Sequence, residues 1–520
     1  MSWDQPYNAA RSPVCAANVV ATSQPLAAQA GLDAMRRGGN AVDAALAAAI
    51  TLTVVEPNNN GLGSDAFAIL WDGRALVGLN ASGRAPALMT RERYAGRTTM
   101  PNRGWEAVTV PGAVSAWVAL SDRYGRLPFA DLFEAAIGYA EDGFQVGPKT
   151  ASYWRLAEQT YADFPDFVEH FLPAPGAGAR FRRPDLARSL EAIAASHGAD
   201  FYEGSLARRM AAASEAAGGP LRAADLAVHR ADWVTPIAQP YGRVALHEIP
   251  PNGQGLAAQI ALAILAQEGP ARFDETAGVH RQIEAMKIAI HAAFRHFADP
   301  DAMRITPEAL LAPDGIARAA ASIGERAGPL PPVALPVSHD TVYLCTADAE
   351  GRMVSFIQSN YQGFGSGVVI PGTGIALQNR GYGFSLDPDH PNCVGPGKRP
   401  FHTIIPGFVT EAGEPRLAFG VMGGHMQHQG HFQMVQRLFD HGENPQAASD
   451  APRWHVFPDF SVGLEQGFPA SVAEGLEARG HAVRYVAEEH VFGGAQLILR
   501  TDDGYVAGSD HRKEGQAVGF

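Results

Sequence analysis

The sequence predicts a layered α/β protein with a helix-rich first part and a strand-rich second part. Apolar residues recur at helical spacing through most of the stretch from residue 112 to about residue 324. From Thr341 onward the chain changes to short runs of β-branched and aromatic residues, which are typical of strands. A proline-rich run at 329–336 separates the two parts, and neither a helix nor a central strand should form there. Helices packed against sheets suit this order of elements.

Two apolar helices are expected near the start of the chain. Residues 26–37 show helical periodicity and end at Gly38-Gly39, and residues 41–54 form a second apolar run that Glu56-Pro57 closes. A turn-rich loop then leads into an expected strand at 67–71, and Asp72-Gly73 predicts a hairpin turn. From 112 to about 324 the chain should be mainly helical, with helices at 114–124, 129–142, 186–196 and 275–297.

Short strands are expected after the proline-rich run. The first opens at Thr341 and extends to residue 347, and a turn at 349–351 leads to a second at 353–358. Further strands are expected at 368–370, 375–378, 403–409, 417–421, 495–499 and 505–507. Gly423-Gly424 stands between one strand and an expected helix at 426–439. Because helix N-termini concentrate unpaired N–H donors, the amides there can stabilise an oxyanion.

Composition and charge narrow the range of partners and compartments. The chain of 520 residues has ample material for a large core, and its net charge of −13 argues against nucleic acid and anionic membranes as partners. The longest apolar run, at 44–55, is too short to span a membrane. The first residues lack a basic region followed by an apolar run, so we expect no secretory signal and a cytoplasmic location. Cys15, Cys345 and Cys393 are too few and too scattered for a disulfide framework.

Thr341 is the candidate nucleophile. It lies where an exposed linker is expected to meet a buried strand, so cleavage before it would release an N-terminal threonine. The α-amine of such a residue ordinarily has a pKa of about 7.7–8.0 and can accept the hydroxyl proton near neutral pH. The alternative interpretation is an ordinary threonine that opens a strand, which is a common position for this residue type.

Other motifs give weaker signals. His425, His428 and His431 are spaced three apart, so two of them could share a helix face and bind a metal; a polar helix face is favoured because no carboxylate or cysteine stands nearby. Arg84 is an isolated loop arginine, usually a solvated charge and less often an anion ligand. The chain has no dinucleotide fingerprint, phosphate-binding loop or zinc-protease helix, so neither a cofactor nor a metal is expected.

Several motifs, taken together and in order, identify a family resemblance. In the second part they include Asp340-Thr341 at the start of a strand, Phe364-Gly365-Ser366-Gly367, the run at 395–400, Gly423-Gly424 and the run at 509–512. In the first part they include the run at 38–44, Gly61-Leu62-Gly63 and Val110-Pro111-Gly112. With these motifs the chain resembles the γ-glutamyltranspeptidase family of N-terminal-nucleophile hydrolases over nearly its whole length.

The resemblance implies a fold, a maturation step and a set of site residues. The fold would be a four-layer αββα sandwich, and autocleavage between Asp340 and Thr341 would give a large helix-rich segment, 1–340, and a small strand-rich segment, 341–520, within one interleaved unit. Thr341 would be the nucleophile, Ser359 would support its amine, and Gly423 and Gly424 would form the oxyanion hole. The two cleaved chains would stay associated, and a homodimer of the cleaved heterodimer remains open.

The sequence departs from the family pattern where a γ-glutamyl group would bind. Ser82 stands where glutathione-cleaving members have an arginine, and Tyr382-Gly383 replaces an acidic pair. Tyr361 replaces an asparagine, and His402-Thr403 replaces paired serines. A zwitterionic glutamyl group would therefore lose its charged partners, and leaving either charge unpaired is unfavourable. This pattern is closer to the oxamate amidohydrolase-like branch of the family.

These departures predict a small acid amide as the substrate. Arg84, Tyr361, His402 and Thr403 are candidates to fix one carboxylate beside the scissile amide, and Tyr382 is a further candidate for the substrate pocket. The first alternative is a γ-glutamyltransferase, a glutathione hydrolase or a cephalosporin-type acylase. The second is an unprocessed, catalytically silent homologue that only binds a small acid.

Overall fold

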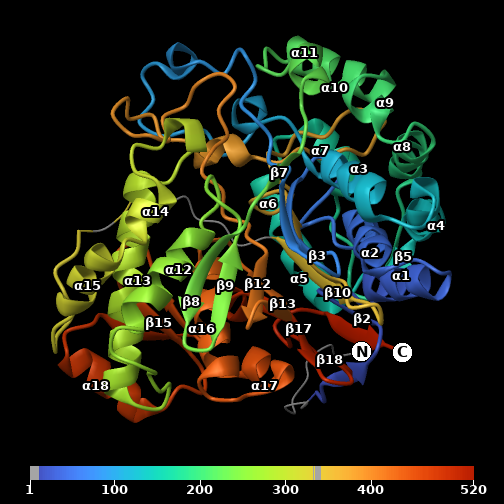
Figure 1. Ribbon diagram of the computed structural model, residues 1–520. Helices are drawn as coiled ribbons and strands as arrows, with labels where there is room; N and C mark the ends of the chain where they lie inside the picture. Colours follow the sequence, from blue (N-terminus) through green and yellow to red (C-terminus); the bar gives the residue numbers. More distant parts are fainter. Residues whose placement is uncertain (1–10, 332, 334–340) are drawn as a thin grey trace.

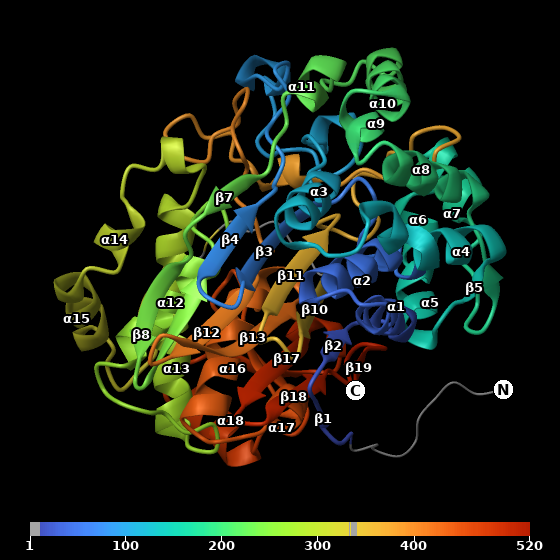
Figure 2. The ribbon, with the colours of Figure 1, turned by 45° about the vertical axis from the view of Figure 1, so that its right-hand side comes forward.

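Two seven-stranded sheets lie face to face in the computed structural model, and helices cover the outer side of each (Figures 1 and 2). The structure describes residues 11–331, 333 and 341–520; Asp340 and half of the proline-rich run lie outside the described residues. The architecture is the four-layer α+β sandwich expected from the sequence. Among the described residues, no helix is long and apolar enough to cross a membrane.

The first sheet carries the strand that follows Thr341. Its order is β19-β2-β10-β11-β3-β4-β7, and all neighbouring strands are antiparallel. The bounds are β19 Gln516–Gly519, β2 Val19–Thr22, β10 Val342–Ala347, β11 Met353–Ser359, β3 Asp65–Trp71, β4 Leu76–Asn80 and β7 Asp232–Val234. Because β10 lies between β2 and β11, the strand opened by Thr341 is central and buried on both faces.

The second sheet is also antiparallel throughout, with the order β1-β18-β17-β13-β12-β9-β8. The bounds are β1 Val14–Ala16, β18 Gly504–Ser509, β17 Gly494–Thr501, β13 Glu414–Met422, β12 Gly407–Glu411, β9 Val244–Glu248 and β8 Ile237–Tyr241. Smaller sheets consist of β14 Trp454–Val456, β15 Val462–Glu465 and β16 Val483–Val486, and of β5 Phe144–Gln145 and β6 Arg180–Phe181. Each large sheet therefore combines strands from both sides of Thr341.

Three apolar layers separate the four structural layers. One large cluster lies between the first sheet and its helices, a second between the second sheet and its helices, and a third between the two sheets. The third contains Tyr343 and Ile357 from the first sheet and Phe408 and Ile498 from the second. Since successive side chains of a strand point to opposite faces, odd-numbered residues of β10 and β11 face the other sheet.

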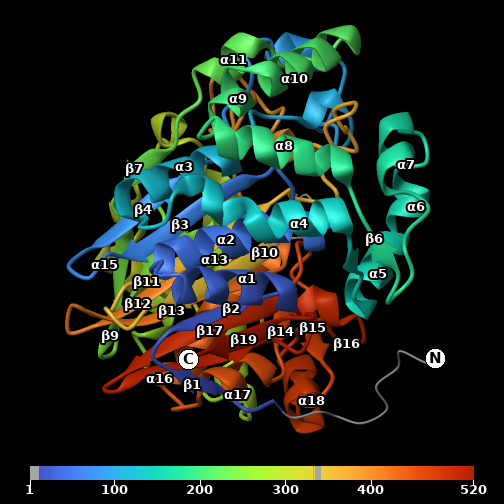
Figure 3. The same cartoon turned by 90° about the vertical axis from the view of Figure 1, so that its right-hand side faces the viewer.

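The helices between residues 25 and 227 cover the first sheet and extend beyond it. Their bounds are α1 Pro25–Arg36, α2 Ala41–Val55, α3 Ala113–Tyr124, α4 Glu134–Asp142, α5 Pro148–Arg155, α6 Ala157–Thr160, α7 Pro165–Phe171, α8 Pro184–Ala195, α9 Ala199–Tyr202, α10 Ser205–Ala216 and α11 Ala223–Ala227. Figure 3 shows α1 and α2 lying over β2. All of α2 is buried, and a capping box fixes its start, because the Asn40 side chain accepts from the Asp43 amide while the Asp43 carboxylate accepts from the Asn40 amide.

The second sheet is covered by a smaller group of helices. They are α12 Gly255–Leu265, α13 Thr276–His296, α14 Pro307–Leu310, α15 Pro313–Ala321, α16 Gln427–Phe439, α17 Pro445–Asp450 and α18 Ala470–Ala478. The long helix α13 packs on α12, which in turn contacts α16. Figure 1 shows α12, α13 and α16 beside the strands β8, β9, β12 and β13.

Three local expectations were wrong. Residues 368–370 and 375–378 form no strands; they make an isolated bridge between Val369 and Ala376, because Gly372 and Gly374 turn the chain between them with positive φ angles. The strand expected at 403–409 begins only at Gly407, after Pro406. Strands β7, β8 and β9 lie inside the stretch expected to be mainly helical, and β8 tolerates Pro240 because it is an edge strand.

Candidate active site

Three polar side chains share one row at the end of the first sheet. Ser359 on β11 lies opposite Asp65 on β3, and Thr341 precedes Val342, which lies opposite Gln358. Thr341, Ser359 and Asp65 are fully buried, and their odd positions on the strands place them on the face toward the second sheet. The Thr341 Oγ1 hydroxyl donates to Ser359 Oγ at 3.1 Å. The structure thus brings the expected nucleophile and its expected supporting hydroxyl into contact.

A strained turn follows Ser359 and positions Tyr361. Its φ angle of 80° lies in the left-handed region, which bulky residues rarely adopt. The Tyr361 amide donates to Ser359 Oγ at 2.8 Å. The same oxygen therefore accepts hydrogen bonds from the Thr341 hydroxyl and from the backbone amide in this turn. The turn places the Tyr361 ring against the guanidinium of Arg380, whose Cζ lies 4.3 Å from the ring centroid. Backbone strain of this kind often accompanies functional sites.

Arg380 is a site residue that the sequence reasoning missed. It is 1% exposed and belongs to the short 3-10 helix Arg380–Gly383. Its Nη1 donates to Thr403 Oγ1 at 2.8 Å, whereas its Nε and Nη2 have no hydrogen-bond partner in the described part of the chain. Burial lowers the pKa of Arg380 to about 10, with Asp65 acting in the opposite direction. An arginine between Asn379 and Gly381 has no periodic or motif signal that could have singled it out.

Asp65 and His402 form a buried pair beside this arginine. His402 Nε2 lies 3.1 Å from Asp65 Oδ2, and Asp65 Oδ1 accepts from the Gly83 amide at 3.0 Å. Burial raises the pKa of Asp65 to about 7, although Arg380 opposes this shift. Burial also lowers the pKa of His402 well below its usual value, so the imidazole is neutral and Nε2 donates. His402, one of the residues expected at the site, is therefore in contact with the Thr341 row, because Asp65 belongs to that row.

Gly423 and Gly424 lie where β13 of the facing sheet ends and α16 approaches. Their φ angles of 137° and 57° are ones that a side chain would disfavour. The first amides of a helical turn have no acceptor within the helix, so this turn offers N–H donors. Gln254 Nε2 donates both to the Gly424 carbonyl at 2.8 Å and to the Thr403 carbonyl at 2.6 Å. The glycine turn and Thr403 are thereby joined, and Thr403 is in turn bonded to Arg380.

Two of the expected binding residues lie farther from the row. Arg84 is partly exposed, and its guanidinium contacts Asp299 at 3.3 Å and Asp232 at 3.8 Å. The Tyr382 ring lies 6.3 Å from that of Tyr361 and lines a cavity of about 670 Å³. The other residues lining this cavity include Phe294, Arg295, Phe384, Phe401 and His291. The ion pairs of Arg84 thus join it to acidic side chains rather than to the residues around Thr341.

The histidines of the α16 region bind separate partners. His431 Nδ1 contacts Glu248 Oε1 at 2.6 Å, and His428 Nδ1 contacts Gln254 Oε1 at 2.9 Å. The face that they form is polar, but it is buried instead of solvent-exposed. No carboxylate was visible near these histidines in the sequence because Glu248 comes from the distant strand β9. Their different partners do not make a shared ligand set.

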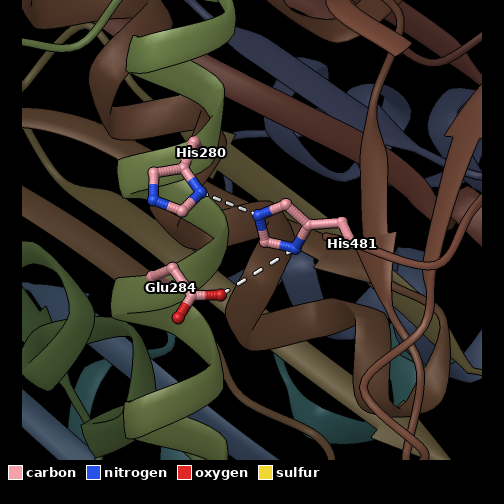
Figure 4. Close-up of side chains that lie close together, drawn as sticks. All are labelled: His280, Glu284 and His481. Carbon is pink, nitrogen blue, oxygen red and sulfur yellow. Dashed lines mark hydrogen bonds and ion pairs between the residues drawn. The ribbon is translucent and has the colours of Figure 1, made fainter. Parts of the chain in front are cut away.

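A second titratable cluster joins α13, which carries His280 and Glu284, to His481 in the loop after α18 (Figure 4). His280, Glu284 and His481 have the spacing of a metal site, yet their polar atoms already bond to protein groups. His280 Nδ1 lies 2.8 Å from His481 Nε2, and Lys287 Nζ lies 3.0 Å from His481 Nδ1. The cluster also holds the chain ahead of the proline-rich run, through His280 to the Gly324 carbonyl and Glu284 to the Gly328 amide.

Comparisons with known proteins agree on one group of relatives. A family model described as γ-glutamyltranspeptidase matches residues 27–520. The chain is 38% identical to the oxamate amidohydrolase proenzyme of Klebsiella pneumoniae, covering 95% of this chain and 97% of that protein. It is 36% identical to the glutathione hydrolase-like YwrD proenzyme of Bacillus subtilis, covering 96% and 98%. A crystal structure of cephalosporin acylase from Bacillus halodurans matches with a TM-score of 0.96 and 46% identity, covering 100% and 99% of the two chains.

Proposed function

The chain belongs to the γ-glutamyltranspeptidase family of N-terminal-nucleophile amidohydrolases, and on that premise we propose that it processes itself and uses Thr341 as its nucleophile. Cleavage between Asp340 and Thr341 would give segments 1–340 and 341–520. The observation that carries the proposal is the 3.1 Å hydrogen bond from Thr341 to Ser359 at the buried start of a central strand. The relatives are named as proenzymes, which supports a maturation step.

The reaction follows from the groups around Thr341. After cleavage, the α-amine of Thr341 accepts the proton of its own hydroxyl, and Oγ1 attacks the carbonyl carbon of the amide. Ser359 holds the nucleophile by its hydrogen bond. The Gly423 and Gly424 amides receive the negative charge on the carbonyl oxygen, a contribution of about 3–4 kcal/mol per donor. The C–N bond breaks and ammonia leaves with the proton from the amine. Water then hydrolyses the Thr341 ester and releases the acid.

A small acid amide, such as oxamate, is the proposed substrate. Tyr361, His402, Thr403 and, farther out, Tyr382 and Arg84 are the proposed binding residues. Support comes from the likeness to an oxamate amidohydrolase and from the absence of an arginine at Ser82. His402 and Thr403 are fully buried close to Asp65 and Arg380, so they can shape a compact polar pocket.

An acylase for larger amides is the second candidate. The cavity of about 670 Å³ beside Tyr382 favours it, because this space exceeds what a short acid amide needs. The likeness to a cephalosporin acylase points the same way. Hydrolysis of a γ-glutamyl donor is less favoured, because Ser82 and Tyr382-Gly383 are uncharged and cannot pair with the carboxylate and the ammonium group of the glutamyl moiety.

An intact-mass measurement and an amide panel test the proposal together. Purified protein should appear as two chains divided between 340 and 341, Thr341→Ala should stay as one chain of about 55.1 kDa, and Thr341→Ser should still be cut. The cleaved enzyme should release ammonia from oxamate and hydrolyse γ-glutamyl-p-nitroanilide poorly. Efficient γ-glutamyl turnover that glycylglycine accelerates would establish the transferase instead, and turnover of bulkier amides without turnover of oxamate would establish the acylase.

Three further parts of the proposal have their own measurements. A protein that stays uncut and inactive would match the silent, acid-binding alternative. Light scattering of the cleaved protein tests whether the heterodimer forms a homodimer. Cell fractionation tests the cytoplasmic location.

A further inference from the structure

Arg380 has one edge of its guanidinium group without a partner in the described chain. The side chain is 1% exposed, Nη1 is bonded to Thr403 Oγ1 at 2.8 Å, and the Tyr361 ring covers one face of the group. The atoms left without a hydrogen bond to any described residue are Nε and Nη2. These two N–H groups lie on the same edge and point in parallel, which is the geometry that binds a carboxylate with two hydrogen bonds.

Other arginines of this chain show what that edge binds when it is filled. Arg93, Arg183, Arg272 and Arg512 each use Nε and Nη2 to hold both oxygens of one carboxylate. In Arg183 the two distances to Asp185 are both 3.1 Å, and this side chain is buried like that of Arg380. In the described chain Arg380 therefore combines burial with an empty carboxylate-binding edge.

The carboxyl group of Asp65 does not bind the open Nε and Nη2 edge of Arg380. Asp65 acts on Arg380 through its charge, but no ion pair within 4.0 Å joins these two described residues, and the Asp65 oxygens are engaged by Gly83 and His402. A buried guanidinium without a direct counter-ion is unfavourable by several kcal/mol. A bound anion would offset that cost, whereas a neutral group would not.

The empty edge is close to the nucleophile through a short series of contacts. Arg380 stacks on Tyr361, the Tyr361 amide bonds to Ser359, and Ser359 accepts the Thr341 hydroxyl. Its other contact, Thr403, is joined through Gln254 to the Gly424 carbonyl. Contacts therefore connect the guanidinium group both to the nucleophile row and to the glycine turn.

We propose that Arg380 binds the free carboxylate of the substrate through Nε and Nη2, which makes the substrate the monoamide of a short dicarboxylic acid. This inference rests on the proposed function and replaces Arg84 as the expected carboxylate ligand, because Arg84 already pairs with Asp299 and Asp232. Arg380 is then a specificity-determining residue: it selects an acid amide over an uncharged amide of the same size.

Paired substrates and a matched variant test this role. Oxamate and oxamide have the same scissile amide and differ in the second group, which is charged only in oxamate. Arg380→Gln should lower kcat/KM for oxamate by about 100-fold, mostly through KM, since one charged hydrogen bond alone corresponds to about 10- to 150-fold. The value for oxamide should change little. Arg380→Lys, which keeps the charge but loses the two-pronged edge, should lie between the two.

Arg183→Gln is the control, because it removes a buried arginine whose edge is filled by Asp185. It should lower the melting temperature without changing the ratio of oxamate to oxamide turnover. Intact mass of each variant shows whether self-cleavage still occurs. An equal loss for both amides in Arg380→Gln overturns the proposal, since that result indicates a structural role. A selective loss of oxamate turnover in Arg84→Gln but not in Arg380→Gln overturns it as well.

Binding of oxalate separates this inference from the proposed function. Calorimetry should detect oxalate binding to the unsubstituted protein and at least a tenfold weaker affinity in Arg380→Gln, whether or not any amide is hydrolysed. If the protein is inactive on all amides but oxalate binding depends on Arg380, the proposed function fails and the anion site stands. If oxalate binds equally to both proteins or to neither, the anion site is refuted even in an active enzyme.

Discussion

Substitution of Ser359 by alanine tests whether the contact with Thr341 is catalytic. Ser359 Oγ receives the Thr341 hydroxyl at 3.1 Å and the Tyr361 amide at 2.8 Å. Without it, the Thr341 hydroxyl and, after cleavage, its amine lose a fixed neighbour on the opposite strand. We expect turnover to fall about 10- to 1000-fold, which corresponds to about 1.4–4 kcal/mol of transition-state stabilisation.

The same substitution should also destabilise the fold, and the two effects need separate readouts. The buried Tyr361 amide loses an acceptor, which costs about 1–3 kcal/mol. Ser355→Ala is the matched control, because Ser355 lies on the same face of β11 and its hydroxyl bonds to Tyr343 Oη at 2.8 Å and the Phe419 carbonyl at 3.2 Å. It should lose comparable stability in urea denaturation while its turnover stays close to that of the unsubstituted enzyme.

The assay compares kcat of the two variants on oxamate after intact mass has shown the extent of self-cleavage in each. Active sites should be counted by burst amplitude, so that uncut molecules do not lower the apparent rate. Unchanged kcat in fully cleaved Ser359→Ala would refute the catalytic assignment. Equal losses in Ser359→Ala and Ser355→Ala would show that activity only follows stability.

Three other substitutions test the packing and the buried charges. Gly420→Ala should cost about 1–3 kcal/mol in urea denaturation, because its Cβ would lie 2.4 Å from the Tyr343 ring between the sheets, and an unchanged midpoint would contradict this packing. His481→Gln should make the free energy of unfolding less sensitive to acid, because burial lowers the pKa of His481 to about 3. The neutral imidazole favours the folded state fully above about pH 6.5, and this stabilisation is lost as pH falls, by about 2 kcal/mol at pH 5. Exposed His197→Gln is the control for that measurement, and an equal pH slope in both variants would be inconsistent with the assignment. Asp510→Asn should cost about 3–5 kcal/mol because Arg453 and Arg512 would keep buried charges without this carboxylate, and a small shift in the urea midpoint would count against that pairing.

Local signals explain why much of the fold could be predicted. The two N-terminal helices end at a glycine pair and at Glu56-Pro57, and the structure places those ends within a residue of the expected positions. The hairpin of β10 and β11 joins Thr341 and Ser359 because both strands and their turn are close in sequence. Strand β9 was missed because its buried Glu248 resembles a surface residue until His431 is placed beside it.

The rest of the site depends on contacts that no local pattern encodes. Asp65 joins the row only because β3 pairs with β11 across the sheet. Arg380 lies in a loop without periodicity, and its importance becomes visible only when one edge of its guanidinium group is found unpaired within the described chain, in a buried place. The sequence favoured Arg84 as the carboxylate ligand because its positive charge is evident from the sequence alone. Its acidic partners, Asp232 and Asp299, are distant in sequence, so the ion pairs could not be predicted.

The mixed origin of the strands in each sheet has a consequence for the lifetime of the mature enzyme. A cut before Thr341 would leave β10 hydrogen-bonded to β2 of one segment and β11 of the other, so the molecule would persist although its backbone is interrupted. Refolding after denaturation would then require two separate chains to meet, so it would depend on concentration, whereas the uncut precursor folds as a single molecule. The covalent connection between the two segments would thus assist folding only once, before cleavage. The lifetime of the cleaved enzyme would then depend on a slow rate of unfolding, because the two chains would not readily refold together once they had separated.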